Sequence, residues 1–213
     1  MIALSAIDII HPLLSILLPS GQSSLKWPES LFGMVEVRAP KNNTGTNIMI
    51  RDAISSDAEA IAAIYNHYVS NTVITFEETP VTAAEMASRI ESVQASDLPW
   101  LVLTENDRII GYAYATQFKA RSAYRFSVES TVYLSPESHG NGYGTSLYES
   151  LIAKLQALGI KNIIGCITLP NPASVALHEK MQMIQVGLFP DIGYKFDQWL
   201  DVGYWQLSLL TSE

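Results

Sequence analysis

Residues 128–144 read VESTVYLSPESHGNGYG, and this stretch joins a strand to a glycine-rich turn and then to the start of a helix. Residues 128–134 are rich in β-branched and aromatic side chains, which favour a strand. Pro136 ends this strand because proline lacks an amide hydrogen and restricts the residue before it. After the turn, apolar residues recur at helical spacing, which predicts an amphipathic helix closed by Gly159. Its apolar positions are Leu147, Leu151, Ile152, Leu155 and Leu158.

The turn carries Gly140, Gly142 and Gly144. Glycines let main-chain N–H groups converge on an anion, and a helix N-terminus adds the positive end of its dipole. Alone, such a turn is more often a plain connection between a strand and a helix. Two phosphate-binding motifs are excluded. A Walker loop requires a lysine after its last glycine, and a Rossmann loop belongs to the first βαβ unit of its domain.

The sequence HGNGYG at residues 139–144 resembles the pyrophosphate loop Gln/Arg-x-x-Gly-x-Gly/Ala of the GNAT superfamily of N-acetyltransferases. Other segments are similar to its phosphinothricin and methionine sulfoximine acetyltransferase branch, and the similarity covers about residues 48–210. The resemblance implies an α+β GNAT fold, in which a mixed central sheet has helices on both faces. The similar segments are residues 65–68 (YNHY), 119–133 (KARSAYRFSVESTVY), 169–171 (LPN), 177–179 (LHE) and 199–206 (WLDVGYWQ).

The composition is that of a globular domain with a full core, since 48% of the 213 residues are hydrophobic and 16% are charged. The net charge of −8 argues against nucleic acid as a partner, and no apolar run is long enough to span a bilayer. The single cysteine, Cys166, excludes an internal disulfide and is compatible with a reducing cytoplasm. It lies in a predicted interior strand, so we interpret it as a small core residue.

Residues 1–47 differ in composition from the rest of the chain. The start is apolar, but Asp8, Pro12 and Pro19 interrupt it and no basic residue precedes it, which disfavours a signal peptide. A linker-like stretch rich in glycine, proline and asparagine follows. We therefore expect a poorly ordered N-terminal extension in front of one acetyltransferase domain at residues 48–213.

Periodicity and capping signals predict the remaining elements. Two capping boxes, Ser56 with Glu59 and Thr82 with Glu85, each predict the start of a helix, and the second helix ends near Ala95. The predicted strands are residues 48–50, the hairpin 100–104 and 109–115, then 163–168, 184–188 and 203–210, and a further helix is predicted at 173–181.

Acetyl transfer to an amine requires a held thioester, a deprotonated amine and a protonated leaving thiolate. Glu129 is the candidate general base, because a carboxylate within an apolar strand is costly unless it has a function or a partner. Alternation places it on the same face as Thr131 and Tyr133. The alternative is a structural ion pair, and the resemblance favours the base because Glu129 matches the family's glutamate.

His178 follows Asn171 by seven residues. The resemblance implies that it lies close to the cofactor sulfur, where most relatives carry a tyrosine as general acid and this branch carries histidine. Two roles are open, protonating the thiolate or assisting the base. A histidine on a helix is otherwise more often packed or solvated.

The resemblance also implies an acetyl-CoA site. The end of the central strand pairs with the pantetheine arm, the glycine turn binds the pyrophosphate, and Asn171 contacts the cofactor arm. Asn171 is equally suited to cap the helix that Pro172 begins. The implied cofactor-binding residues are Val132, Tyr133, Leu134, His139, Gly140, Asn141, Gly142, Tyr143, Gly144 and Asn171.

The acceptor is expected beside Lys119, Arg121 and Tyr124, which match the branch's acceptor loop, and beside Phe76, which matches an aromatic wall of the acceptor pocket. Two cations next to an aromatic ring suit an acceptor with acid groups, whereas a solvated basic loop is the alternative. Neighbouring Arg125 is interpreted as solvated.

Three positions depart from the family pattern. His139 stands where glutamine or arginine is usual and Gly140 where this branch often has arginine, so phosphate binding is expected to rely on main-chain amides and cofactor affinity to be modest. Gln182 replaces a glycine after the helix that carries His178, which is expected to change the exit of that helix.

The expected activity is acetyl-CoA-dependent N-acetylation of the α-amine of a small amino-acid analogue such as phosphinothricin or methionine sulfoximine. Alternatives are another acceptor, such as a polyamine or a protein N-terminus, and a non-catalytic CoA-binding sensor, which the presence of both Glu129 and His178 disfavours. We expect no metal, nucleic acid or membrane partner, and a cytoplasmic homodimer.

Overall fold

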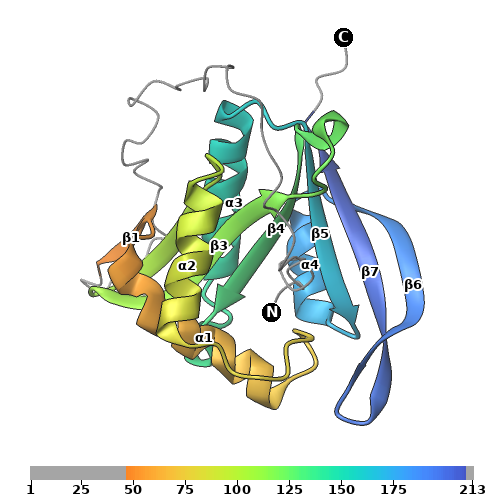
Figure 1. Ribbon diagram of the computed structural model, residues 1–213, viewed down its shortest axis with the longest axis horizontal. Coiled ribbons are helices and arrows are strands. Elements are labelled where there is room, and N and C mark those ends of the chain that lie inside the picture. Colours follow the sequence, from red (N-terminus) through yellow and green to blue (C-terminus); the bar gives the residue numbers. More distant parts are fainter. Residues whose placement is uncertain (1–46, 210–213) are drawn as a thin grey trace, which may run out of the picture.

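The computed structural model describes residues 47–209, and these form one seven-stranded sheet in the order β1-β2-β3-β4-β5-β7-β6 with four α-helices (Figure 1). The α+β prediction is confirmed. The extension predicted for residues 1–47 lies outside the described residues apart from Asn47. The strands are β1 Ile48–Asp52, β2 Trp100–Glu105, β3 Arg108–Gln117, β4 Ser127–Leu134, β5 Asn162–Leu169, β6 Ile184–Lys195 and β7 Gln198–Ser208; the helices are α1 Ala58–Asn71, α2 Ala83–Gln94, α3 Tyr143–Ala157 and α4 Pro172–Lys180.

The sheet separates two apolar layers, as Figure 1 shows with α1 and α2 on one face and α3 and α4 on the other. Alternate residues of β4 supply both layers, because successive side chains of a strand point to opposite faces. Val132 packs in the layer beneath α3, whereas Tyr133 packs beneath α1. The central strand is therefore buried on both faces, which explains its almost continuous apolar sequence.

One of the two predicted capping boxes is present. Thr82 Oγ1 accepts from the Glu85 amide at 3.2 Å, and the Glu85 carboxylate accepts from the Thr82 amide at 2.8 Å. The box predicted at Ser56 and Glu59 is wrong, because α1 begins at Ala58, one residue later than that box requires, and its N-cap is Asp57. The buried carboxylate of Asp57 organises this turn instead, by accepting from the amide of Ile54 at 2.9 Å and pairing with Arg51 at 2.6 Å.

The parallel pair at the centre of the sheet is short. β4 and β5 are in register only from Ser127 with Asn162 to Ser130 with Gly165, which is four pairs. Both strands continue beyond this point, and Figure 1 shows them drawing apart toward their C-terminal ends. Residues 131–134 therefore pair with β3 on one side and leave the other edge of β4 open.

The closing hairpin is longer than predicted. β6 extends to Lys195 and β7 begins at Gln198, so the strands predicted at residues 184–188 and 203–210 are only the distal parts of a long ribbon. The sequence did not indicate this longer strand because Pro190 lies within it, and proline lacks the amide that donates to a ladder. The register shifts around this proline, between Phe189 and Gly193. The ribbon turns at Phe196 and Asp197, which both have positive φ angles of 50° and 58°.

The exit of α4 uses the residue that replaces the usual glycine. Gln182 adopts a left-handed conformation with φ of 63°, and its amide donates to the carbonyl of Glu179 at 2.9 Å. A side chain at this position costs conformational energy that glycine does not. The backbone of the helix exit therefore keeps the left-handed conformation that glycine would allow, and the conformational cost falls on Gln182 alone. The predicted cap at Gly159 is confirmed by its φ of 75°.

Candidate active site

A cavity of about 210 Å³ lies where β4 ends and α3 begins. Gly140 and Gly142 form its turn with φ angles of 83° and 79°, and an added Cβ at either would meet no atom within 4 Å. Glycine is therefore required there by backbone conformation, not by space. Gly142 is the N-cap of α3 and provides no side-chain cap, so the amides of the first turn are available to an anion. The lining residues are Leu134, His139, Gly140, Gly142, Tyr143, Gly144, Thr145, Ala173 and Leu177.

This cavity contains six of the ten predicted cofactor residues. It also contains Thr145, Ala173 and Leu177, which the sequence did not indicate. Asn141 is exposed at the tip of the turn. Val132 and Tyr133 do not line the cavity; they lie in the part of β4 whose second edge is unpaired, where an extended ligand can add as a strand.

His139 stands at the rim of the cavity, beside the end of α1. Its Nε2 lies 3.2 Å from the hydroxyl of Tyr68, and that hydroxyl donates to the carbonyl of Leu134. Partial desolvation lowers the pKa of His139, the nearby His67 lowers it further, and Glu137 opposes the shift. The imidazole is therefore neutral at pH 7 in the free protein.

Asn171 caps α4. Its Oδ1 accepts from the amide of Ser174 at 3.2 Å, and Pro172 occupies the first helical position. The capping role is confirmed. The contact with the cofactor arm stays a prediction.

Glu129 is buried, with 6% of its surface exposed, on the face of the sheet that also carries Cys166. Burial and the negative charge of Glu129 raise the pKa of the Cys166 thiol to about 12, so this cysteine is a protonated core residue as predicted. Burial raises the pKa of Tyr204, the neighbouring Cys166 raises it further, and the Glu129 carboxylate adds a smaller contribution. Tyr204, on β7, is thus a polar neighbour of Glu129 that the sequence did not indicate.

His178 is fully buried under the opposite face. Its Nδ1 donates to the carbonyl of Ser174 at 2.8 Å, and within residues 47–209 its Nε2 has no hydrogen-bond partner. Burial lowers the pKa of His178 to about 4. The ring is therefore neutral, and Nε2 carries a lone pair. Gly165 makes room for it, because a Cβ there would lie 2.3 Å from the imidazole Cδ2.

Glu129 and His178 lie on opposite faces of the sheet. Ser130 and Gly165 are register partners and share a face, where the Ser130 hydroxyl is 2.6 Å from the hydroxyl of Tyr148. The Tyr148 ring packs edge-on against His178 with 5.2 Å between centroids. Since Glu129 precedes Ser130, its side chain points the other way. The two candidate catalytic groups are thus not in contact, and they flank the point where the ladder between β4 and β5 ends.

The predicted acceptor loop connects β3 to β4 and reaches the strand just before Glu129. Its ends are joined by a hydrogen bond of 3.2 Å from the Phe118 amide to the Ser127 carbonyl. Phe118 packs edge-on against Tyr124 at 5.8 Å and lies 5.1 Å from the ammonium of Lys119. Lys119, Arg121 and Tyr124 are exposed. The loop therefore presents two cations and an aromatic ring to solvent.

Phe76 lies elsewhere, in the connection from α1 to α2. Its ring packs against the backbone of Gly193 in β6, where an added Cβ would approach to 2.0 Å. The structure therefore places Phe76 against the β6–β7 hairpin, and the other three predicted acceptor residues on the connection between β3 and β4.

A sheet that opens beside its central strand, with a glycine turn and a helix N-terminus at the end of that strand, defines a class of coenzyme-dependent acyltransferase. The chain belongs to the GNAT family, since the family model described as an acetyltransferase (GNAT) domain matches residues 50–203. It is an N-acetyltransferase.

Among characterised relatives, the chain is similar to the phosphinothricin N-acetyltransferase of Streptomyces viridochromogenes, with 39% identity over 75% of this chain and 86% of that protein. It is also similar to the L-methionine sulfoximine/L-methionine sulfone acetyltransferase of Pseudomonas paraeruginosa, with 34% identity over 75% of this chain and 94% of that one. A solved structure of a phosphinothricin acetyltransferase from Sinorhizobium meliloti in complex with acetyl-CoA matches with 40% identity and a TM-score of 0.74, over 76% of this chain and 88% of that chain.

Two further observations concern the described part of the chain. None of its helices is long and apolar enough to cross a membrane. Within residues 47–209 there is also no group of three histidine, cysteine, aspartate or glutamate side chains placed to hold a metal ion.

Proposed function

We propose that this enzyme transfers the acetyl group of acetyl-CoA to the α-amine of a small amino-acid analogue of the phosphinothricin or methionine sulfoximine kind. The observation that carries the proposal is the arrangement along β4. The anion-binding cavity lies at the C-terminal end, the cationic loop with Arg121 lies at the N-terminal end, and Glu129 lies between them. The names of the relatives given above indicate acceptors of this kind.

Acetyl-CoA fits the residues present. The glycine turn and the first turn of α3 offer main-chain donors to its phosphates, and the open edge of β4 at Val132 and Leu134 offers a partner for an extended arm. Acetyl-CoA would supply the activated acetyl thioester. Asn171, at the start of α4, is the assigned side-chain contact to the arm.

In this proposal Glu129 removes a proton from the acceptor ammonium. Its burial in the sheet holds the carboxylate in one place, and its face is the one on which Tyr204 lies. His178 approaches from the other face with an unprotonated Nε2. Of the two roles left open by the sequence, protonating the thiolate is disfavoured by this protonation state, because Nε2 carries no proton to donate.

Lys119, Arg121 and Tyr124 are assigned to the acid groups of the acceptor, and Phe76 to the wall of its pocket. No ion pair within residues 47–209 involves the guanidinium of Arg121, so its charge is available to a ligand. A charge-assisted hydrogen bond is worth about 1.5–3 kcal/mol.

The test is the pair Arg121→Ala and Arg125→Ala, assayed with phosphinothricin, methionine sulfone, a polyamine and a simple amine. Arg125 is a matched control because it is exposed in the same loop and stacks on Phe126 at 4.4 Å. We expect Arg121→Ala to raise KM for acid-bearing acceptors by about 10- to 100-fold and to leave KM for acetyl-CoA unchanged. Good turnover of the polyamine by the wild type would contradict the proposed acceptor class, and binding of acetyl-CoA without turnover of any amine would favour a sensor.

A homodimer and a cytoplasmic location stay predictions. The most suitable dimer surface is the β6–β7 hairpin, because β6 is an edge strand and carries large exposed apolar side chains. Light scattering of the purified protein tests the dimer. The exposed residues are Ile184, Val186, Leu188, Phe189, Ile192, Tyr194, Phe196 and Trp199.

A further inference from the structure

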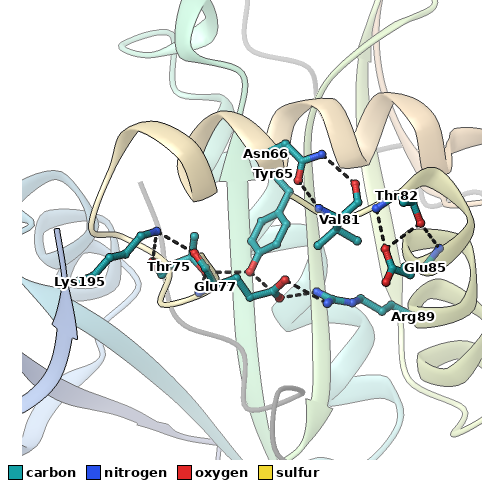
Figure 2. Close-up of polar contacts among 9 residues, drawn as sticks. All are labelled: Tyr65, Asn66, Thr75, Glu77, Val81, Thr82, Glu85, Arg89 and Lys195. Carbon is teal, nitrogen blue, oxygen red and sulfur yellow. Dashed lines mark hydrogen bonds and ion pairs between the residues drawn. The ribbon is translucent and has the colours of Figure 1, made fainter. Parts of the chain in front are cut away.

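Lys195, near the turn of the β6–β7 hairpin, is buried with only 1% of its surface exposed, although lysine is among the residues most rarely buried. Its ammonium donates to three main-chain carbonyls, those of Val69, Thr75 and Glu77, each at 2.8 Å. An ammonium has three N–H donors, so all of them are used. Figure 2 shows the side chain reaching from the hairpin to the segment that carries Thr75.

The three carbonyls lie in the last turn of α1 and in residues 72–82, the connection between α1 and α2. Burial lowers the pKa of Lys195, and Glu78 and Glu77 oppose this shift. A buried charge is costly unless it is well hydrogen-bonded. The arrangement therefore fixes the distance between two segments that are far apart in the sequence.

The same connection is held from α1 and α2 as well. The hydroxyl of Tyr65 lies 2.7 Å from Thr75 Oγ1 and donates to the Glu77 carboxylate at 2.9 Å. Arg89 binds that carboxylate with two hydrogen bonds of 2.6 and 3.1 Å (Figure 2). Asn66 exchanges two hydrogen bonds with the backbone of Val81, at 2.8 and 2.7 Å.

Phe76 is the residue between the two held positions Thr75 and Glu77. Lys195 binds the carbonyls on both sides of it, and the Phe76 ring packs on Gly193, two residues before Lys195 in the same strand. Residues two apart in a strand share a face. One face of β6 thus holds both the backbone around Phe76 and the ring itself.

We propose that Lys195 is a positioning residue for the acceptor side of the site, which holds residues 72–78 so that Phe76 forms a fixed wall against the β6–β7 hairpin. The inference rests on the proposed function because that function assigns Phe76 to the acceptor pocket. Lys195 itself does not touch the reacting groups.

Lys195→Met keeps the length of the stem and removes the three donors. We expect amide exchange in residues 72–78 to speed up by about tenfold or more, while the amides of the paired strands β3 and β4 keep their protection. The matched control is Lys161→Met, because Lys161 is exposed and lies just before β5. Unchanged exchange in residues 72–78 of Lys195→Met would overturn the proposal, and this readout does not depend on the acceptor.

The kinetic test uses the best acceptor that the wild type acetylates in the panel above, so that a wrong acceptor class is recognised separately. We expect Lys195→Met to raise the acceptor KM by about tenfold and to change KM for acetyl-CoA by less than about twofold. In the background of Phe76→Ala, the additional effect of Lys195→Met on the acceptor KM should fall below about twofold.

Independent, multiplicative effects of the two substitutions would overturn the proposal, because Lys195 would then act through something other than Phe76. An equal rise in the KM for the acceptor and the KM for acetyl-CoA would also overturn the proposal, since it would indicate a general loss of structure. Lys195→Arg replaces Lys195→Met if the latter does not fold. Arginine keeps the charge, but its planar fork cannot meet three converging carbonyls, so we expect the same changes at a smaller size.

Discussion

The two ends of β4 are constructed in different ways. At the C-terminal end, one continuous segment, residues 139–144, supplies most of the residues that line the cavity, as a glycine turn that leads into α3. At the N-terminal end, the proposed acceptor side would collect side chains from the loop before β4, the connection between α1 and α2, and the β6–β7 hairpin, and the last two of these segments are in contact. A site made of backbone can be recognised in a local sequence, whereas a site made of side chains depends on how distant segments meet.

The largest expected effect comes from the residue between these two ends. Glu129→Gln should lower kcat by about 10²- to 10⁴-fold, because it removes the proposed base and keeps the shape of the side chain. Binding of acetyl-CoA, measured by calorimetry, should be unchanged. The control is Glu149→Gln, at an exposed position of α3. Near wild-type turnover in Glu129→Gln would remove this residue from the mechanism.

The cofactor end can be separated from the acceptor end by a glycine substitution. Gly142→Ala forces a side chain into a left-handed conformation, which costs about 1–2 kcal/mol, with no steric clash to add to it. If the turn relaxes to relieve this cost, KM for acetyl-CoA should rise by about 5- to 30-fold while the acceptor KM stays constant. Gly187→Ala is the control, since its Cβ also meets open space and its φ is not positive. A matching rise in the acceptor KM would show that the two ends are coupled.

The side chain that departs from the family pattern should make the cofactor end sensitive to pH. The pKa of His139 is lowered in the free protein, and a bound diphosphate favours the protonated ring. Binding therefore takes up a proton, so the affinity for CoA should rise by about three- to tenfold as the pH falls from 8 to 5. His139→Gln should abolish this dependence, whereas His67→Gln, at the neighbouring imidazole, should retain it. Calorimetric titration with CoA at several pH values measures this dependence in the wild type and in both variants.

The smallest expected effect lies outside both ends. Gln182→Gly should stabilise the protein by about 0.5–1 kcal/mol, because glycine adopts the left-handed conformation without the cost of a Cβ. For a domain of this size that corresponds to a rise in Tm of about 1–4 °C in a thermal melt. Both KM values should remain at wild-type levels. A change in either would mean that the exit of α4 influences the position of His178.

Much of the cofactor end was predictable from sequence because its signals are local. The strand at residues 128–134, the glycine turn that leads into a helix and the cap at Asn171 all follow from the chemistry of neighbouring residues. The separation of β4 from β5 was not predictable. Ladder pairing is a tertiary property, and residues 131–134 look like any buried strand.

The acceptor side was predicted only in part. Lys119, Arg121 and Tyr124 were identified through the family resemblance, and the structure places them together on one loop. Lys195 was missed because the sequence around it, Tyr-Lys-Phe-Asp, is typical of an exposed turn. Its three acceptors are main-chain carbonyls, which carry no sequence signature. Gly165 was missed for a similar reason, since its importance lies in the ring of His178 above it.

The short register between β4 and β5 has a mechanical consequence. β3 and β4 share seven register pairs and β5 and β7 share eight, but only four pairs join the two halves at the middle of the sheet. The sheet can therefore be regarded as two rigid halves, β1–β4 and β5–β7, joined by one short ladder. It should deform most easily where β4 and β5 meet. A molecule that binds between β4 and β5 and pairs with β4 would stabilise this junction. Acetyl-CoA, the proposed cosubstrate, would thus also make the sheet more rigid while it is bound.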